Sequence, residues 1–557
     1  MPSPQKPTKL QQQATKEEER EKRKRAIAEI YADFVKDGIL FPLRSDLKSV
    51  GVTIDTVRHH FGTLSKLRQS AKEWFPDSFK GVIDLEQYLS EKNLKRIAGE
   101  IKAHKRFVIT TAVSGQPLHG DFLASMHMYC KHNDAKLLIL PSHDPAHNLD
   151  NEIDWHFDEL IAEEDIIFEE TRLNSNLFIS EIRVTAKQIN PVTGLSELSQ
   201  TKGSFIFASP KQSLEFDSVS ANKLPHARMT TGACTLPSYR TKRGNSLRTA
   251  YMATFQHVIG ALIVEIKDDN IYHFRQVQAA KDGSFCDFGK QYSIKGVKKV
   301  KPKLVMGDYH AGEHDDSAVE AWIEMIKEMG IEEVFFHDMF NGVSVNPHEE
   351  DDIILKSERA ALGLNSIENE MRITAREFDR ILGVPGVKKG VVIKSNHDDF
   401  IDRWLRKGKF AKDPINFKFG CRLAAEVHGT KKDFFNEGLR LVGLPKNYDK
   451  IQWLSVDEDY LVGGINCGAH GDKGANGSRG GIRNLAKSYP KCIVGHSHTP
   501  GIFKGVFQVG TTSRLRLGYN KGPSSWVHCS CLVYDNGQRQ LVNSIRGMWR
   551  LESDIRK

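Results

Sequence analysis

The sequence predicts an α/β protein of several domains, and three observations support this fold class. Its 557 residues are too many for one hydrophobic core, so roughly two to four domains are expected. Segment 104–141 runs strand, helix, strand, which is the pattern of a parallel sheet. From about residue 303 onward, apolar strands alternate with amphipathic helices. The sequence therefore favours mixed α/β domains that follow a helical N-terminal segment.

Composition and charge leave the function open but exclude some classes of protein. The chain is 39% hydrophobic and 27% charged, which is ordinary for a soluble globular protein. It contains no apolar run long enough to span a membrane, and its first residues lack the apolar core of a secretory signal. The net charge of +8 permits a polyanionic partner without requiring one. We expect a cytoplasmic protein without a membrane span.

The eight cysteines point to a reduced, intracellular protein. They are scattered along the chain, and no C-x-x-C pair occurs among them. Cys529 and Cys531 lie two residues apart in an expected strand, so they share one of its faces. We interpret both as small core residues and not as metal ligands.

The N-terminal part is predicted to be a short tail followed by a helical domain. Residues 1–14 are rich in Pro, Gln and Lys and are expected to be disordered. Residues 15–99 are predicted to be helical, in a helix-turn-helix-like pattern. One of these helices is capped by Thr53 and ended by Gly62. Arg58 and Lys66 are its candidate DNA contacts. The alternative is a plain helical hairpin with a solvated basic face.

Two further regions and a linker complete the expected organisation. Residues 100–293 are predicted to form a mixed α/β middle domain that contains the strand-helix-strand unit. The lysine-rich stretch "IKGVKKVKPK" marks a boundary, so 294–302 is predicted to be a basic linker. Such a linker is either simply solvated or lies along a phosphate backbone. Residues 303–557 form the last expected domain.

The last region repeats one event at five places: an apolar strand ends, and His, Asp or Asn follows at once. In α/β sheets, ligand sites gather at the carboxyl ends of the strands. A single His after a strand is usually an ordinary loop residue, but five such ends in one region predict a metal site. The residues that would meet there are Asp308, His310, Asp338, Asn396, His397, His470, His496 and His498.

The ligand types indicate which metals and how many. Histidine and carboxylate without thiolate suit Mn, Fe or Zn. Asp308 and His310 lie two residues apart, as do His496 and His498, and side chains at this spacing point the same way in an extended segment. Because these groups exceed what one ion needs, they indicate two ions that share a carboxylate.

The order of these motifs resembles that of the calcineurin-like metallophosphoesterase superfamily. The chain has D-x-H, D-x-x-N, N-H-D, a lone His and G-H-x-H in that order. The SbcD-type nuclease branch is the most similar. The resemblance implies that 303–557 folds as a two-sheet α/β sandwich flanked by helices. The whole chain also resembles the pre-early DNases with which T-five-type tailed phages degrade host DNA.

The resemblance assigns a role to each matching residue. One metal would be held by Asp308, His310 and His498, and the other by Asn396, His470 and His496. Asp338 would bridge the two ions. The cofactor implied is a pair of divalent ions, with Mn favoured over Mg, Fe or Zn.

Three positions depart from the family pattern. His337 stands where the family usually has Gly, Asn341 where it usually has a second Asp, and Ser395 where it usually has Gly. None of these changes removes a metal ligand. The first two alter the hydrogen bonding expected around Asp338, which tunes such metals. His337 is either a further active-site contact or a core residue, and we favour the core residue.

The expected activity is hydrolysis of a DNA phosphodiester by a water that the two metals activate. His397 would protonate the leaving oxygen. Asp398 would orient His397, cap the next helix, or do both. Arg514 and Arg516, which follow the last motif, are candidate phosphate contacts, with ordinary surface charge as the alternative.

Two other functions remain open. One is a phosphatase or cyclic-nucleotide phosphodiesterase of the same superfamily. The other is a non-catalytic DNA-binding or regulatory protein with a vestigial metal site, against which the intact ligand set argues. The expected partners are DNA, another phage early protein and further copies of the chain. The expected location is the host cytoplasm.

Overall fold

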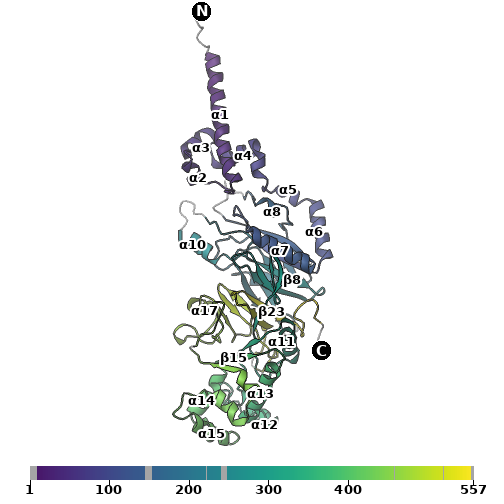
Figure 1. Cartoon of the computed structure of the whole chain (residues 1–557), viewed down its shortest axis with the longest axis vertical. Coiled ribbons are helices and arrows are strands. Elements are labelled where there is room, and N and C mark those ends of the chain that lie inside the picture. The colour runs from purple at the N-terminus through teal and green to yellow at the C-terminus, as the bar shows by residue number, and fades with distance from the viewer. Residues whose placement is uncertain are drawn as a thin grey trace, which may run out of the picture.

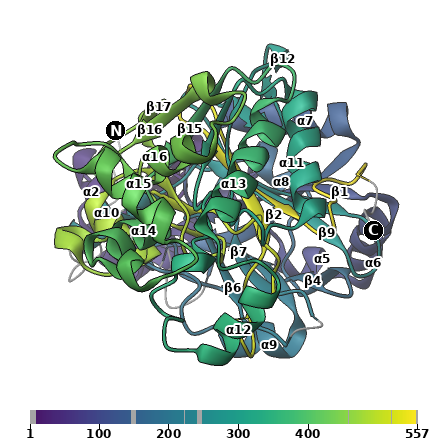
Figure 2. The ribbon, with the colours of Figure 1, turned by 90° about the horizontal axis from the view of Figure 1, so that it is seen from below.

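The computed structural model describes residues 9–144, 153–220, 223–239, 247–456, 458–518 and 520–553. It shows an elongated molecule, with N-terminal helices at one end of the long axis and the helices of residues 353–427 at the other (Figure 1). Figure 2 looks along this axis from the second end, where helices cover the sheets behind them. Helices and several mixed sheets together confirm a mixed α/β protein.

Six helices form the N-terminal segment, which begins earlier than expected. They are α1 (Lys9–Lys36), α2 (Arg44–Ser49), α3 (Ile54–Phe61), α4 (Leu64–Trp74), α5 (Leu85–Tyr88) and α6 (Glu91–Ala103). The expectation of disorder over 1–14 is therefore wrong for 9–14, whose Lys, Gln and Leu residues are good helix formers. Residues 1–8 lie outside the described residues.

The two residues predicted to begin and end a helix in this segment are confirmed. The Thr53 side chain accepts a hydrogen bond from the backbone N–H of Thr56 at 3.2 Å. Helix α3 ends at Gly62, whose φ of 77° suits a residue without a Cβ. Arg58 and Lys66 both lie exposed on this segment. DNA contact by these two side chains stays a prediction.

Arg68 belongs to the same basic run but is buried, with 2% of its surface exposed. Its Nε lies 2.5 Å from Asp154 Oδ2, and its other nitrogens lie 3.0 Å from His156 Nδ1 and 2.7 Å from the Leu40 carbonyl oxygen. These contacts join the N-terminal helices to the sheet-bearing body. Arg68 is therefore a structural residue and not a DNA contact.

Arg68→Met should destabilise the protein by about 3 kcal/mol, because it leaves the Asp154 carboxylate without its buried partner. The free energy of unfolding from urea denaturation measures this loss. The matched control is Lys66→Met on the same helix, which changes an exposed lysine. Equal stability of the two variants would contradict the structural role of Arg68.

The predicted strand-helix-strand unit is confirmed. Strand β1 (Arg106–Ser114) leads into α7 (Gly120–Asn133), and β2 (Ala135–His143) returns parallel to β1. Their register runs from the pair Arg106 and Ala135 to the pair Ser114 and His143. Strands β8 (Gly260–Ile266) and β9 (Tyr272–Gln278) extend the sheet on the β1 side, in the order β2-β1-β8-β9.

Two larger sheets and one small sheet contain the other strands of the described residues. The first has the order β16 (Ile451–Leu454), β15 (Lys389–Ile393), β14 (Glu333–Phe336), β13 (Lys303–Val305), β22 (His528–Val533), β23 (Arg539–Ser544). The second has the order β17 (Leu461–Val462), β18 (Ile465–Asn466), β19 (Cys492–Val494), β21 (Val506–Gln508), β20 (Gly501–Phe503), β6 (Ser213–Asp217), β7 (His226–Thr230), β5 (Ser204–Phe207), β4 (Leu177–Ile179), β3 (Thr171–Asn174).

The regions 100–293 and 303–557, predicted as successive domains, are not structurally independent of each other. The second of these sheets combines strands from both regions, and β6 pairs antiparallel with β20 at its centre. One buried cluster likewise contains Ile206 and Met229 together with Ile493 and Phe507. The two regions share a sheet and a core, which no local composition signal could reveal.

The predicted linker 294–302 is part of a small sheet. Strand β12 (Gly296–Lys299) pairs antiparallel with β11 (Lys290–Ser293), which pairs with β10 (Phe285–Asp287). Lys298 and Lys299 are exposed on this edge. These lysines are therefore exposed to solvent on the outer strand of a hairpin.

Helices cover one face of the sheet that contains β13, and the sheet that contains β6 packs on the other. Val392 packs with the helix side chains Trp322 and Phe378, whereas Val391 and Ile393 belong to the cluster between the sheets. This alternation follows the two-residue period of a strand. The covering helices are α11 (Asp316–Met329), α13 (Ile367–Leu382), α14 (Asp398–Arg406), α15 (Phe417–Val427) and α16 (Phe434–Val442). Helix α12 (Ile353–Ala361) has no buried residue and lies at the surface.

The remaining helices are α8 (Glu159–Ala162), α9 (Ser196–Lys202), α10 (Leu247–Gln256) and α17 (Ile482–Ser488). Within the described ranges, every helix is too short or too polar to cross a lipid bilayer. Cys529 and Cys531 are buried on β22 in the inter-sheet core, which confirms their interpretation as core residues.

Candidate metal centre

The strand ends singled out in the sequence meet at one place. Strands β13, β14 and β15 are parallel neighbours, so their carboxyl ends lie along one edge of the sheet. The predicted ligands after β18 and β19, in the facing sheet, reach the same place, since His470 and His496 both contact Asn396, which follows β15. The fold thus gathers the side chains that the sequence separates by almost 200 residues, Asp308 and His498 among them.

One group of ligands contains Asp308, His310, Asp338 and His498, whose candidate ligand atoms all lie within 4.8 Å of one another. His498 Nε2 lies 3.2 Å from Asp308 Oδ2 and 3.0 Å from His310 Nε2. All four side chains are buried. Two imidazole nitrogens this close to each other and to carboxylates form a donor set suited to a divalent cation.

A second group forms around the amide oxygen of Asn396. This oxygen lies 3.0 Å from His470 Nε2 and 2.9 Å from His496 Nδ1. His470 Nε2 also lies 3.4 Å from Asp338 Oδ2, an atom that is 3.7 Å from His310 Nε2. Asp338 therefore lies between the two groups and could be shared by both.

The hydrogen bonding of the buried carboxylate oxygens shows whether these residues suit a metal ion. Both carboxylate oxygens of Asp308 and Oδ1 of Asp338 have no hydrogen-bond donor among the described residues. Leaving a buried charged acceptor unsatisfied is costly, so such atoms call for a cation. The two carboxylates and their imidazole neighbours fit a metal site on chemical grounds.

The protonation states in this cluster follow from burial and from mutual charge. Burial, together with the nearby Asp338 charge, raises the pKa of Asp308 to about 8. Burial also opposes ionisation of Asp338, but the neighbouring His470 and His397 outweigh it and lower the Asp338 pKa. Burial lowers the pKa of His310 to about 3, helped by His397. A neutral His310 presents a lone pair to a metal.

The backbone is strained where it presents the ligands. His310, Asp338, His496 and His498 have positive φ values of 52°, 44°, 74° and 58°. Non-glycine residues seldom adopt this left-handed conformation, and where they do they tend to cluster at functional sites. The fold holds four of the seven predicted ligands this way.

Gly495→Ala should disrupt the cluster without changing a ligand. A Cβ at this position would lie 2.3 Å from Asp308 Oδ1 and 3.0 Å from His337 Cγ. The carboxylate must then move, so we expect metal affinity to fall at least tenfold, as measured by manganese titration calorimetry. The control is Gly518→Ala, whose Cβ would meet nothing within 4 Å. Unchanged affinity in the Gly495 variant would place Asp308 outside the metal site.

His337 is a member of the cluster that the sequence interpretation undervalued. It is fully buried, as a core residue would be, but its Nδ1 lies 3.2 Å from His470 Nδ1. Its candidate ligand atom lies within 4.8 Å of those of Asp308 and His470. Its place directly before Asp338, a predicted ligand, was the available signal.

His397 lies at the rim of the cluster and is held by the backbone. Its Nδ1–H donates to the carbonyl oxygen of Asn341 at 2.5 Å, and its ring centre lies 4.6 Å from that of His310. The Asn341 side-chain oxygen is 3.2 Å from His310 Nδ1. Asn341, which departs from the family pattern, thus positions both histidines.

The expectation that Asp398 orients His397 is wrong. Asp398 Oδ2 accepts a hydrogen bond from the Ser395 backbone N–H at 3.0 Å, and the carbonyl of Asn341 holds His397 instead. Asp398 is the first residue of α14, which agrees with the alternative role in the first turn of that helix. The backbone N–H of Asp398 in turn donates to Ser395 Oγ at 3.3 Å. This reciprocal pair of hydrogen bonds joins the start of α14 to the end of β15.

Asp398→Asn should stabilise the protein increasingly as pH rises from about 4 to about 8. Burial raises the pKa of Asp398 to about 8, although Lys394 opposes the shift. Between these pH values the unfolded chain ionises this carboxyl and the folded chain does not, so the stability of the wild type falls as pH rises. The asparagine removes this loss, about 1 kcal/mol or more at pH 8 in urea denaturation. A constant difference between pH 5 and pH 8 would contradict the shift.

The two basic residues after the last motif already have protein partners. Arg514 pairs with Glu313, and Arg516 donates to the carbonyl oxygens of Asn520, at 3.4 Å, and Gly522. These contacts fix the loop that follows β21. Phosphate contact by Arg514 and Arg516 stays a prediction that requires an exchange of partners.

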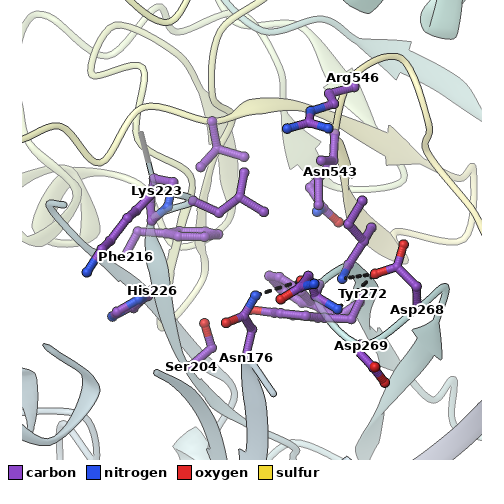
Figure 3. Close-up of a pocket in the computed structure, with 17 residues that line it drawn as sticks. Asn176, Ser204, Phe216, Lys223, His226, Asp268, Asp269, Tyr272, Asn543 and Arg546 are labelled. Atoms are coloured by element: carbon purple, nitrogen blue, oxygen red, sulfur yellow. Dashed lines mark hydrogen bonds between the residues drawn. The ribbon is translucent and has the colours of Figure 1, made fainter. Parts of the chain in front are cut away.

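A cavity of about 810 Å³ lies away from these ligands (Figure 3). Its lining combines Phe216 and Tyr272 with Lys223, Asp268 and Arg546, and it includes none of the predicted site residues. The close-up shows the basic Lys223 and Arg546 and the acidic Asp268 and Asp269 around the same cavity. The metal centre therefore does not coincide with this cavity.

Fold and site together define a mixed α/β protein with a buried His and Asp cluster that could hold a metal ion. The chain is similar to Protein A1 of Escherichia phage T5, with 28% identity over 475 residues. The match covers 80% of this chain and 83% of the phage protein. No family model matches the chain. No solved structure matches it.

Proposed function

We propose that the chain is a metal-dependent DNase of the calcineurin-like metallophosphoesterase class, which degrades host DNA in the host cytoplasm during phage infection. The observation that carries the proposal is the buried cluster of Asp308, His310, Asp338 and His498 beside Asn396, with its unpartnered carboxylate oxygens. The similarity to a phage T5 protein supports the phage setting. The two packed sheets flanked by helices support the fold that the class implies.

Two divalent ions, Mn in preference to Mg, Fe or Zn, would be held by the seven predicted ligands. Asp308, His310 and His498 would hold one ion, and Asn396, His470 and His496 the other, with Asp338 shared. When bound, the pair would supply positive charge to the phosphate and an activated water as nucleophile. The buried setting strengthens these electrostatic interactions because it excludes bulk water.

His397 is the proposed proton donor to the leaving oxygen. The Asn341 carbonyl fixes Nδ1–H, so the other ring nitrogen is the one that exchanges a proton with substrate. Its ring is partly exposed, in contrast to the buried ligands. Donation at this atom removes the negative charge that develops on the departing alkoxide.

DNA is the proposed substrate because the chain joins the metal centre to a helix-turn-helix segment with exposed basic residues. Arg58 and Lys66 lie on its solvent side, where they could contact phosphates. The net charge of +8 has the sign required for a polyanion. A phosphatase for small esters would have no use for such a segment.

Purified protein should be tested on circular and linear duplex DNA with Mn, Mg or a chelator. We expect DNA loss with Mn and none with the chelator. If both DNA forms survive while bis(4-nitrophenyl) phosphate is hydrolysed, the enzyme is a small-ester phosphodiesterase and the DNA proposal fails. If neither substrate is cleaved, the chain is a non-catalytic protein.

A further inference from the structure

Residues 303–544, the metal-bearing half of the chain, repeat the topology of residues 106–278, the half that precedes it. In the first half, β1 pairs parallel with β2 across the helix α7 and antiparallel with β8, which pairs antiparallel with β9. In the second half, β13 pairs parallel with β14 across α11 and antiparallel with β22, which pairs antiparallel with β23. The order of these four strands and the sense of each pair are the same. Strands β15 and β16, which extend the second sheet beyond β14, have no counterpart among the described strands of the first sheet.

The facing sheet repeats in the same way. The first half contributes β3-β4-β5-β7-β6 with pair senses antiparallel, parallel, parallel and antiparallel. The second half contributes β17-β18-β19-β21-β20 with identical senses. The two halves meet where β6 pairs antiparallel with β20, so equivalent strands adjoin each other. Nine strands match one for one, which chance does not explain.

Isolated bridges align the two halves residue by residue. Thr111 bridges to Ala233, which bridges to Ile259, and Asp308 bridges to Thr511, which bridges to His528. The backbone bonds agree: the N–H of Thr111 donates to Gly232 at 3.1 Å, and that of Asp308 donates to Gly510 at 3.2 Å. Thr111 therefore stands in the place of the ligand Asp308.

The strand registers place three further ligand positions, whereas Asn396 follows β15, which has no counterpart among the described strands of the first half. Thr111 pairs with Leu140, and the β13–β14 register extended to Asp308 places Asp338 opposite it, so Leu140 replaces the bridging aspartate. The last β5–β7 pair is Phe207 with Thr230, and the last β19–β21 pair is Val494 with Gln508. Counting onward from these pairs, Ser209 replaces His496 and Lys211 replaces His498.

These replacements cannot hold a metal. Leu140 has no ligand atom, and Lys211 contributes a cation whose Nζ donates to the carbonyls of Lys187 at 3.4 Å and Gln188 at 2.5 Å. Thr111 Oγ1 accepts a bond from the Ser209 backbone N–H at 3.0 Å and lies 2.7 Å from Thr231 Oγ1. Hydrogen bonds within the protein take the place of ion coordination.

The first half contacts a loop that lies beside the candidate metal centre. The N–H of Val219, just after β6, donates to the Ser524 carbonyl at 3.1 Å, and the N–H of Ser524 donates back at 2.9 Å. Two residues further on, the ring centre of Trp526 lies 4.1 Å from that of the ligand His498. This loop of the metal-bearing half is thus fixed by the half that has no ligands.

We propose that residues 106–278, the degenerate lobe, are a second copy of the metal-bearing lobe (303–544) that has lost its own metal site. The degenerate lobe now serves to brace the loop beside the remaining centre. One chain then contains two lobes but a single metal centre, and its first lobe takes part in catalysis only by positioning.

Metal counting tests the loss of the site without any substrate, so it stands apart from the DNase proposal. Full-length protein loaded with Mn and desalted should hold about two ions per chain by plasma mass spectrometry. Asp308→Asn with Asp338→Asn should hold none, and Ser209→Ala with Lys211→Met should keep the wild-type count. About four ions in the wild type, or ions that remain in the Asp308 and Asp338 variant, would overturn the proposal.

Hydrogen exchange tests whether the degenerate lobe holds the loop that contains Ser524 and Trp526. Val219→Pro removes one of the two hydrogen bonds to Ser524, whereas Val219→Ala keeps both. We expect amides of 520–527 to exchange about tenfold faster in the proline variant and within about twofold of wild type in the alanine variant. Hydrolysis of bis(4-nitrophenyl) phosphate should fall in the proline variant at unchanged metal content. Equal exchange in both variants would show that the degenerate lobe does not hold the loop.

Discussion

Asp338→Asn should reduce DNA cleavage by about a thousandfold or more, the largest effect of any single change considered. Asp338 Oδ2 lies between His310 and His470, at 3.7 and 3.4 Å, and is the only predicted ligand shared by both groups. An amide of the same shape loses the charge that would hold two cations together, and the metals supply several kcal/mol of charge stabilisation. The measurement is the rate of DNA loss with Mn.

The control for this variant is Asp351→Asn, which removes the same charge from an exposed turn. It should retain wild-type cleavage. Manganese content measured on the same samples separates loss of metal from loss of folding, which circular dichroism monitors. An Asp338 variant with full activity would end the two-metal assignment.

His397→Gln should lower cleavage of DNA by about two to three orders of magnitude, the range of general acid catalysis. Its metal content should remain at the wild-type level, because His397 is not among the predicted ligands. The loss should be much smaller with bis(4-nitrophenyl) phosphate, since nitrophenolate leaves without a proton. This dependence on the leaving group distinguishes a proton donor from a residue that merely shapes the site.

The matched control is His428→Gln, an exposed histidine at the end of α15. It should leave both substrates unaffected. Equal losses on the two substrates in the His397 variant would assign that residue to binding or positioning and would leave the leaving oxygen without a donor.

The sequence predicted which side chains gather at the candidate metal centre because strand ends carry a local signal. The apolar run Val391 to Ile393 followed by Asn396 can be recognised without a structure, and parallel neighbours must bring such ends together. The same local logic placed Thr53 and Gly62 at the ends of α3. It could not foresee that the Asn341 carbonyl, and not Asp398, holds His397, because a backbone contact across loops leaves no trace in residue type.

The organisation of the chain was harder to predict than the site. Lysines at 295–301 suggested a linker, yet a hairpin edge needs solvated side chains just as a linker does. Arg68 continued a basic surface pattern but is buried against Asp154, a partner far along the chain. The repeat of two lobes could not be recognised from the sequence, because the equivalent short strands share a pairing pattern and not their amino acids. Pairing between remote strands is set by tertiary contacts that propensity does not encode.

The β6–β20 pair has a consequence for folding and for fragments of the chain. Cutting before residue 303 would leave the metal-bearing lobe with β20 as an open sheet edge, and such edges recruit other strands and aggregate. During synthesis, β6 can pair at once with β7, but its second partner β20 follows almost 300 residues later. Pairing at this separation is slow because the entropy of loop closure is lost before the contacts between the strands form. We therefore expect the first lobe to require protection from self-association until the second has emerged from the ribosome.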